Sequence, residues 1–385
     1  MKEYKRLGDY IREVNVRNRE LEVTNLLGVS ISKEFMPSIA NTIGTDMSTY
    51  KIVKRGQFAY GPVTSRNGDK VSIALLSKYN DAIISQAYTV FEIIEHEQLL
   101  PEYLMMWFRR PEFDRYARFH SHGSAREVFD WDELCDVKLP IPCIERQREI
   151  VAEYETLTRR IRLNEQIIQH LESIAQSLYS KMFVDGIDKE NLPEGWRIGT
   201  LGEVIESYSK THNFNKSNLI FLNTSDIYGG RILHREYSKV SKMPGQAKKR
   251  IANGDILFSE IRPANKRYAI VRETNPEDFI VSTKLMVLRM INKKDSNLKI
   301  YFYLTSPEVL EELQKQADGA SGTFPQITFE ENLKNRMIII GDTSTEKKWN
   351  NFLSTYYNNV WNKESENEKL TELQSLLLAK MGQYK

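Results

Sequence analysis

Asp255 and Glu260 are the two carboxylates whose spacing comes nearest to the metal-binding pair of a nuclease. Such sites favour a lysine two residues after the glutamate, and Arg262 stands at that position instead. The pair Gly254-Asp255 is also typical of a turn that leads into a strand, here over residues 256–258. We therefore interpret the segment as a turn, and keep a nuclease site as the lesser alternative.

Histidine and cysteine are too sparse or too closely spaced to predict a metal site. His120 and His122 are two residues apart, which does not give the i, i+4 pair that binds zinc on a helix, and we expect them in a polar loop. Cys135 and Cys143 are eight residues apart with no CxxC motif, whereas a structural zinc needs four tightly spaced ligands. We expect two buried, reduced thiols and no bound metal.

Motifs for cofactor chemistry are absent from the sequence. No GxxxxGK[ST] phosphate loop occurs, which argues against an ATP-driven motor. The Asn/Asp-Pro-Pro-Tyr/Phe tetrad with which amino-methyltransferases hold a flipped adenine is missing too, and Asn275-Pro276-Glu277 is the nearest approach. The sequence thus predicts no catalytic residue and no cofactor in this chain.

Length and composition predict a folded protein of more than one domain. The 385 residues exceed a typical single domain, and 41% hydrophobic residues suffice for real cores. The formal net charge is only +2, so a nucleic-acid signal must come from local clusters. The N-terminus carries no apolar leader and no run of about 18 apolar residues occurs, so we expect a soluble, cytoplasmic protein.

The sequence contains an internal repeat, in which two similar copies are offset by about 198 residues. Matching pairs of segments are 55–60 with 253–258, 83–87 with 279–284, 106–112 with 303–308, 122–125 with 318–321, and 176–182 with 374–381. We expect two mixed α+β lobes related by a pseudo-twofold axis. Strands are predicted over 70–76, 88–94, 267–271 and 284–288, and short helices near 101–118 and 297–317.

Each copy ends in a long helix whose apolar or small residues recur at alternating spacings of four and three. The first series is Ile150, Tyr154, Leu157, Ile161, Ile168, Leu171, Ala175, Leu178 and Met182, interrupted by the polar Asn164. The equivalent positions of the second copy are Trp349, Leu353, Tyr356, Val360, Leu370, Leu377 and Met381, with the polar Lys363, Asn367 and Gln374 among them. This period predicts a coiled-coil seam, which we expect to be antiparallel. Polar residues in the middle of such a seam can fix its register. The alternative is that each helix packs on its own lobe.

These patterns predict five segments. They are a first lobe over 1–143, a first spacer helix over 144–184, a linker over 185–195, a second lobe over 196–342 and a second spacer helix over 343–385. Ser344 or Thr345 is expected to cap the second helix. A helix of roughly 35 residues spans on the order of 50 Å, comparable to about 15 base pairs of duplex.

Local charge indicates a nucleic-acid partner more clearly than net charge does. Seven lysines or arginines lie between residues 242 and 267 against Asp255 and Glu260, and smaller basic clusters occupy 109–126 and 51–70. The clusters recur in both copies, interleaved with Gly, Ser, Asn and Tyr, which suit contacts to phosphates and base edges. A solvated surface is the alternative for any single cluster.

The segment 139–150, LPIPCIERQREI, resembles the Pro-Pro-Leu-x-Glu-Gln-x-x-Ile start of the spacer helix in specificity (S) subunits of type I restriction–modification enzymes. Ile141 and Arg146 depart from that pattern, and residues 340–347 of the second copy have largely lost it. The helix ends at 178–183 and 376–381, the turn at 254–257, the Gly-Trp at 195–196 and the Leu-Gly pairs at 7–8 and 201–202 are similar to the family as well. The resemblance covers the whole chain.

This resemblance implies a sequence-specific DNA-binding subunit without catalysis. Each lobe would be a target-recognition domain that reads one half of a bipartite, asymmetric site, and the spacer helices would set the distance. Two modification subunits would methylate adenine with S-adenosylmethionine, and a restriction subunit would use ATP and magnesium. The rivals are a coiled-coil scaffold that does not bind DNA and a single-chain nuclease.

Candidate DNA contacts follow from residue type and repeat position. Arginine pairs with guanine, asparagine or glutamine with adenine, and lysine with phosphate. In the first lobe the candidates are Ser65, Arg66, Asn67, Ser124 and Arg126. In the second lobe they are Arg262, Asn265, Lys266, Arg267, Ser321, Thr323 and Gln326, with Lys248, Lys249 and Arg250 as phosphate clamps.

Overall fold

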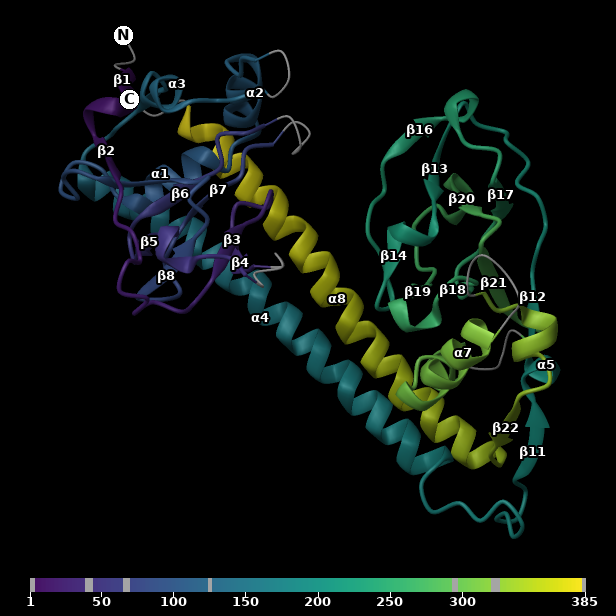
Figure 1. Cartoon of the computed structure of the whole chain (residues 1–385). Helices are drawn as coiled ribbons and strands as arrows, with labels where there is room; N and C mark the ends of the chain where they lie inside the picture. Colours follow the sequence, from purple (N-terminus) through teal and green to yellow (C-terminus); the bar gives the residue numbers. More distant parts are fainter. Residues whose placement is uncertain are drawn as a thin grey trace. The chain divides into compact units, whose positions relative to one another are not determined.

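The computed structural model describes residues 4–38, 44–64, 70–123, 127–292, 297–319 and 326–382 (Figure 1). The chain forms two compact units. Unit 1 comprises Met1–Glu165 and Lys363–Lys385, and unit 2 comprises Gln166–Asn362. Both boundaries fall inside the longest helices, α4 (Ile144–Phe183) and α8 (Thr343–Met381), so each unit contains part of each helix. Among the described residues, no helix is long and apolar enough to cross a membrane.

Unit 1 is built on an antiparallel sheet of four strands with a set of shorter pairs. The sheet has the order β2 (Ile11–Val14), β9 (Thr89–Ile93), β6 (Phe58–Tyr60), β7 (Ile73–Leu75). The pairs are β1 (Tyr4–Arg6) with β10 (Lys138–Pro140), β3 (Leu27–Val29) with β4 (Phe35–Pro37), and β5 (Lys51–Lys54) with β8 (Asp81–Ile84). The helices are α1 (Pro101–Phe108), α2 (Pro111–Phe119) and α3 (Trp131–Cys135), with 3-10 turns at Leu7–Asp9 and Met47–Thr49.

Unit 2 contains two four-stranded sheets, of which the first is antiparallel like the sheet of unit 1. The first has the order β12 (Ile205–Ser207), β21 (Leu285–Met290), β18 (Ile256–Ser259), β19 (Tyr268–Ile270). The second has the order β16 (Tyr237–Lys239), β13 (Asn218–Leu222), β20 (Phe279–Ser282), β17 (Ala247–Arg250), in which β13 and β20 are parallel. The strand pairs are β11 (Arg197–Thr200) with β22 (Met337–Ile340) and β14 (Ile227–Tyr228) with β15 (Arg231–Ile232).

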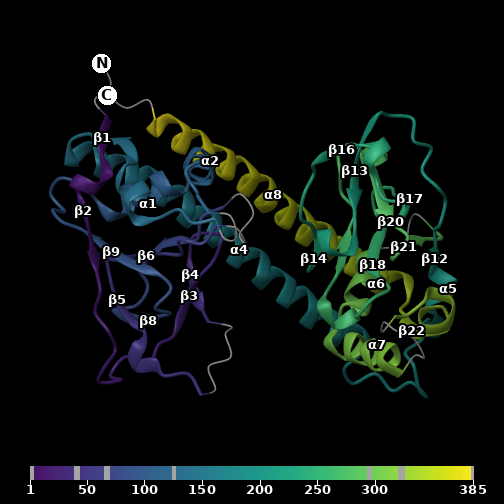
Figure 2. The same cartoon turned by 45° about the horizontal axis from the view of Figure 1, so that its top comes forward.

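The helices of unit 2 lie at one end of the unit, with β13 and β16 at the other (Figure 2). They are α5 (Leu201–Val204), α6 (Asn297–Leu304) and α7 (Pro307–Gly319). Short 3-10 turns occupy Thr224–Asp226, Val240–Lys242, Pro263–Asn265 and Pro276–Asp278, and a π-helical turn occupies Phe329–Leu333.

The two units repeat one strand pattern, which confirms the prediction of two related α+β lobes. The sheets β2-β9-β6-β7 and β12-β21-β18-β19 have equivalent strand orders. Gly56 and Gly254 precede the equivalent strands β6 and β18 with φ values of 86° and 90°, a conformation that glycine adopts without strain. Their N–H groups donate to the carbonyls of Leu76 at 2.8 Å and Val271 at 3.0 Å. The turn predicted at Gly254-Asp255 is thus present in both copies.

Helices α4 and α8 pack antiparallel within each unit. In unit 1, Thr158 of α4 contacts Gln374 of α8 and Asn164 contacts Asn367, so the numbers rise on one helix as they fall on the other. In unit 2, the rings of Tyr179 and Trp349 lie 6.0 Å apart. The predicted antiparallel coiled coil is confirmed.

The sequence analysis also allowed that each long helix packs on a lobe. The structure shows this packing in addition to the contact between the helices. Ile150 and Tyr154 of α4 lie in the core of unit 1 together with Met381 of α8. Trp349 and Leu353 of α8 lie in the core of unit 2. Each helix end therefore buries apolar surface both against the other helix and against a lobe, which stabilises the pair more than the seam alone would.

Two local predictions were wrong. The side chain that caps α8 is that of Asp342, not Ser344 or Thr345: its Oδ1 accepts the Thr345 N–H at 2.6 Å, because the helix already begins at Thr343. Cys135 is buried as expected, but Cys143 is exposed. Cys143 directly precedes α4, in a segment that runs at the surface.

Candidate nucleic-acid interface

The loop between β18 and β19 of unit 2 has two non-glycine residues in the left-handed conformation. Arg262 has a φ of 47° and Lys266 a φ of 53°, on either side of the 3-10 turn Pro263–Asn265. Each left-handed side-chain-bearing residue costs on the order of 1–3 kcal/mol, so the surrounding structure must hold this backbone in place. Strain of this kind is concentrated at functional sites.

Hydrogen bonds from three directions hold the loop. Within it, the Asn265 N–H donates to the Arg262 carbonyl at 2.9 Å and the Lys266 N–H to the Pro263 carbonyl at 3.1 Å. Gln314 of α7 accepts the Ala264 N–H through Oε1 at 3.1 Å. On the other side, the Gly229 N–H donates to the Lys266 carbonyl at 2.9 Å.

The side chains that this loop presents are free to bind a ligand. Arg262, Asn265 and Lys266 are all exposed, whereas Pro263 between them is buried. Within the described part of the chain, no side chain forms a hydrogen bond or ion pair with those of Arg262, Asn265 or Lys266. A guanidinium, an amide and an ammonium therefore project from one rigid turn, and these are the groups that contact guanine, adenine and phosphate.

Gln326 lies beside this loop. It forms an isolated antiparallel bridge with Ile261, and its Oε1 accepts a hydrogen bond from Lys284 Nζ at 3.3 Å. The Ile327 N–H donates to the Glu260 carbonyl at 2.8 Å. Gln326 and Ile327 thus lie next to the start of the loop 260–267, and the roles of these residues in DNA binding remain a prediction.

Unit 1 has an equivalent bridge between the described residues at the corresponding positions. Val63 and Val128 form an isolated antiparallel bridge, and Ile261 and Gln326 stand at the same positions one repeat further along the chain. The Thr64 N–H donates to the Glu127 carbonyl at 3.0 Å. In both units, therefore, an equivalent bridge pairs a residue just before the first predicted DNA-contact segment with a residue at or just after the end of the second.

Several predicted contact residues lie outside the described residues, and their role remains a prediction. They are Ser65, Arg66, Asn67, Ser124, Arg126, Ser321 and Thr323.

Of the three predicted phosphate clamps, only Lys248 is exposed. Lys249 Nζ donates to the carbonyls of Thr283 at 3.0 Å and Leu285 at 2.8 Å. Burial lowers the pKa of this lysine, and Glu260 offsets only part of the effect. Arg250 Nε donates to the Tyr208 hydroxyl at 2.8 Å. Both side chains are therefore engaged by groups within unit 2, and their role as phosphate clamps remains a prediction.

Other basic residues of the predicted clusters are buried or already bound to neighbouring side chains, so they are less available to a ligand. Arg267 is half-buried and donates to the Thr224 hydroxyl at 3.3 Å. In unit 1, Arg110 is buried, and Arg118 pairs with Glu127. A count of basic residues along the sequence therefore overstates the positive charge that is available at the surface.

The proposed nuclease pair does not form a site. Asp255 is 1% exposed and accepts hydrogen bonds from Arg289 Nε and Nη2, both at 2.7 Å. Glu260 follows the other end of β18, on the order of 15 Å away at the rise of an extended strand. Two carboxylates so far apart, one of them already paired with an arginine, cannot share a metal ion.

The seam residues of unit 1 form a mixed apolar and polar stripe. Ile150 and Tyr154 are buried, and Leu157, Ile161, Leu370 and Leu377 are half-buried. Asn164 is buried, and its Nδ2 donates to Asn367 Oδ1 at 2.9 Å. Arg160 pairs with Glu366 at 2.7 Å beside this contact.

The seam residues of unit 2 are more apolar. Ile168, Trp349, Leu353, Tyr356 and Val360 are buried, and Leu171 and Leu178 are half-buried. Trp349 is fully buried, with the Phe183 ring 5.7 Å away and the Phe302 ring 6.2 Å away.

Two supporting residues were missed by the sequence analysis. Gln314 fixes the loop at Ala264, and Lys284 bridges Gln326 to Glu260. Both lie far from the loop in sequence, and neither belongs to a basic cluster. The repeat offered one indirect signal, because Lys284 belongs to the segment that matches residues 83–87.

Each of the two units has the same four-stranded sheet order and contains part of both long helices, which defines a class of two-domain proteins built on an internal repeat. The model of the type I restriction modification DNA specificity domain matches residues 32–173 and 193–372. This chain belongs to that family.

Curated relatives and a solved structure are similar to the chain. The HindI type I restriction enzyme specificity subunit of Haemophilus influenzae is 39% identical over 158 residues, which cover 40% of this chain and 33% of that protein. The MjaIX specificity subunit of Methanocaldococcus jannaschii is 21% identical over 310 residues, covering 75% of this chain and 70% of the relative. The chain thus matches only about a third of the HindI subunit's length.

The crystal structure of a type I restriction–modification S subunit from M. genitalium has a TM-score of 0.56 and 13% identity to this chain. The likeness covers 99% of this chain and 96% of the other. At that identity it shows a shared fold.

Proposed function

We propose that this chain is the DNA-binding specificity subunit of a type I restriction–modification complex and has no catalytic site of its own. Each lobe reads one half of a bipartite, asymmetric site on double-stranded DNA. The family membership supports the class, and the matching bridges Val63–Val128 and Ile261–Gln326 support two reading sites.

The observation that carries the proposal is the exposed turn of unit 2. Arg262 and Asn265 would contact base edges, where a bidentate arginine selects guanine and a bidentate asparagine selects adenine. Lys266 would contact phosphate and fix the turn in the groove. Because the backbone is already held in its strained form, little conformational entropy is lost on binding.

In this proposal the paired helices fix the distance between the half-sites and dock the partner subunits. Two modification subunits would bring S-adenosylmethionine and methylate adenine, and restriction subunits would bring ATP and magnesium. The chain itself would hold no cofactor. The division into lobes over 1–143 and 196–342, spacer helices over 144–184 and 343–385, and a linker over 185–195 belongs to the same proposal.

Salt dependence of duplex binding tests the proposal against a coiled-coil scaffold that does not bind DNA. A protein that contacts several phosphates loses roughly 0.9 log units of affinity per contact for each log unit of salt. We expect a steep slope for the complex assembled with its modification subunits. Absence of duplex binding, or a flat response, would favour the scaffold.

Half-site variants test the independence of the two lobes. We expect Lys266→Ala to weaken binding by about 1–3 kcal/mol at one half-site and to leave the other unchanged, and Arg66→Ala to do the reverse. Lys315→Ala, on α7 and paired with Glu311, is a matched exposed control that should change neither. Equal losses at both half-sites would refute separate reading.

A further inference from the structure

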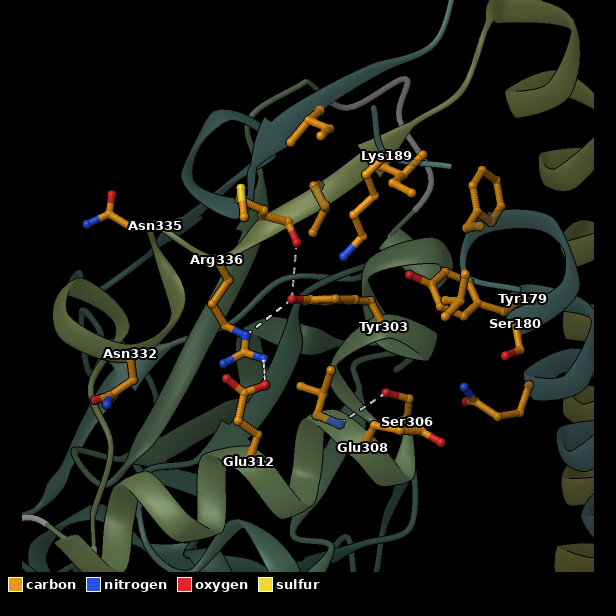
Figure 3. A pocket seen from close by; sticks show the side chains of 18 of the residues that line it. Tyr179, Ser180, Lys189, Tyr303, Ser306, Glu308, Glu312, Asn332, Asn335 and Arg336 are labelled. Carbon is orange, nitrogen blue, oxygen red and sulfur yellow. Dashed lines mark hydrogen bonds and ion pairs between the residues drawn. The ribbon is translucent and has the colours of Figure 1, made fainter. Parts of the chain in front are cut away.

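Unit 2 contains a cavity of about 610 Å³ between the end of α4, the start of α7 and strand β22 (Figure 3). Tyr303 crosses its centre, and Tyr179, Ser306 and Glu308 lie along one side (Figure 3). Three exposed apolar side chains lie at its edge: Val184 is 55% exposed, Ile198 39% and Met337 69%. Several large apolar side chains gathered around one cavity are typical of a site that a partner covers.

The internal repeat shows what fills the corresponding place in unit 1. In the repeat, Trp107 corresponds to Tyr303 and Arg110 to Ser306. The backbones agree, because the Arg110 N–H donates to the Trp107 carbonyl at 3.2 Å and the Ser306 N–H to the Tyr303 carbonyl at 3.3 Å. Each residue also directly precedes a helix that begins with proline, α2 or α7.

Arg110 occupies that place in unit 1 and is buried. Its guanidinium carbon lies 4.2 Å from the centre of the Trp107 ring, and its Nη2 lies 3.6 Å from a carboxylate oxygen of Glu112. A Cβ atom added to Gly382, at the end of α8, would lie 3.0 Å from the same nitrogen. The arginine therefore fills the space between an aromatic ring, a carboxylate and a helix end.

Unit 2 retains that binding environment but lacks the arginine. Glu308 stands where Glu112 stands in unit 1, Tyr303 supplies the ring, and the end of α4 takes the place of the end of α8. Ser306 is too short to fill the space, and its hydroxyl instead accepts the Val309 N–H at 3.4 Å. Among the described residues, no group pairs with the Glu308 carboxylate.

We propose that this cavity binds an arginine side chain of a partner polypeptide, in the position that Arg110 holds in unit 1. The guanidinium would pair with Glu308 and stack on Tyr303, and apolar residues beside the arginine would cover Val184, Ile198 and Met337. A desolvated guanidinium beside an aromatic ring and a carboxylate gains from both. The proposal goes beyond DNA reading and does not depend on it.

Other charged groups in the cavity leave Glu308 available. Arg336 Nη2 donates to Glu312 at 2.6 Å and its Nε to the Tyr303 hydroxyl at 3.2 Å, so these three side chains satisfy one another (Figure 3). Lys189, from the segment after α4, points into the cavity from the opposite side (Figure 3). It is exposed and would move aside for the incoming arginine.

The test uses the full chain and two peptides, acetyl-Leu-Arg-Leu-amide and acetyl-Leu-citrulline-Leu-amide. Citrulline keeps the shape of arginine without its charge. Methyl-labelled methionine reports binding at the edge of the cavity, with the Met337 signal assigned from Met337→Leu. We expect the arginine peptide to shift the Met337 signal and to bind about tenfold more tightly than the citrulline peptide, because the guanidinium pairs with a carboxylate.

Variants identify the site. Glu308→Gln should weaken binding of the arginine peptide about tenfold, whereas Glu112→Gln, the matching change in unit 1, should leave it within about twofold. Lys189→Ala should strengthen it, because a competing cation is removed. Ser306→Arg should abolish it, because the new side chain occupies the cavity.

Three results would overturn the proposal. They are equal affinity for the two peptides, unchanged binding by Glu308→Gln, and no shift of the Met337 signal up to about 10 mM arginine peptide, a concentration at which even weak binding would be detected. Glu308 is exposed, so its glutamine variant keeps the test decisive even where Ser306→Arg disturbs the cap of α7.

Discussion

Asn164 and Asn367 meet side chain to side chain inside the helix seam of unit 1, with Asn164 Nδ2 donating to Asn367 Oδ1 at 2.9 Å. Asn164 is 1% exposed, so water cannot readily replace its partner. A polar pair in an apolar seam favours the one register in which the two amides meet. The contact is therefore a determinant of how α4 and α8 align within the unit.

Removing one member of this pair should destabilise the protein. Asn367→Ala removes the side-chain amide that accepts from the buried Asn164 Nδ2, which should lower the free energy of unfolding by about 1–3 kcal/mol. The double variant Asn164→Leu/Asn367→Leu should recover most of that loss, because two apolar residues then meet. Urea unfolding measures both. If the double variant is as unstable as the single one, the pair is not the source of the effect.

Acid should weaken the same part of the seam. Hydrogen bonds from Arg160 and Lys363 lower the pKa of Glu366 from its usual 4.5 to about 2. A carboxylate with a lower pKa in the folded state stabilises that state above the unfolded pKa, and the contribution is lost as pH falls. We expect stability to decline between pH 4.5 and about 2, and less so in Glu366→Gln. Identical acid profiles for the two proteins would exclude this contribution.

Trp349 should be among the most sensitive positions of unit 2. Its fully buried ring packs against Tyr179, Phe183 and Phe302, so Trp349→Ala should cost about 3–5 kcal/mol. Trp361, on the same helix, is 42% exposed, and Trp361→Ala should cost far less. Thermal unfolding compares the two. Similar losses would contradict the packing described for α8.

Replacing Lys266 with glycine should increase the stability of the fold and weaken DNA binding. Glycine adopts a φ of 53° without strain, so Lys266→Gly should stabilise the fold by about 0.5–1 kcal/mol. The same change removes the ammonium and should weaken DNA binding at one half-site. Calorimetry and a mobility-shift assay measure the two effects. A variant that gained stability and kept its affinity would remove Lys266 from the interface.

Patterns that depend on near neighbours in sequence could be read without a structure. The spacing from Ile150 to Leu178 required a buried helical stripe, and the repeat required equivalent strands after Gly56 and Gly254. Both are present. The resemblance at residues 139–150 identified the family that the comparison with known proteins then showed.

The side-chain partners of individual residues could not be predicted, because those partners are distant along the chain. Lys249 lies in a basic run, yet the carbonyls of Thr283 and Leu285 hold its ammonium. Asp255 resembles a metal ligand in the sequence, but Arg289 donates to both of its carboxylate oxygens. The cavity at Ser306 arises from one small residue where the other copy has Arg110, a difference whose consequence appears only once both environments are visible.

The most direct test of the account is a map of methylated adenines in cells with and without this chain. If each lobe reads one half of a site, the methylated positions should define an asymmetric motif of two parts separated by a fixed gap, and deletion of the chain should abolish that methylation. An unchanged methylation map, or a motif without a gap, would contradict the claim that two lobes read two half-sites.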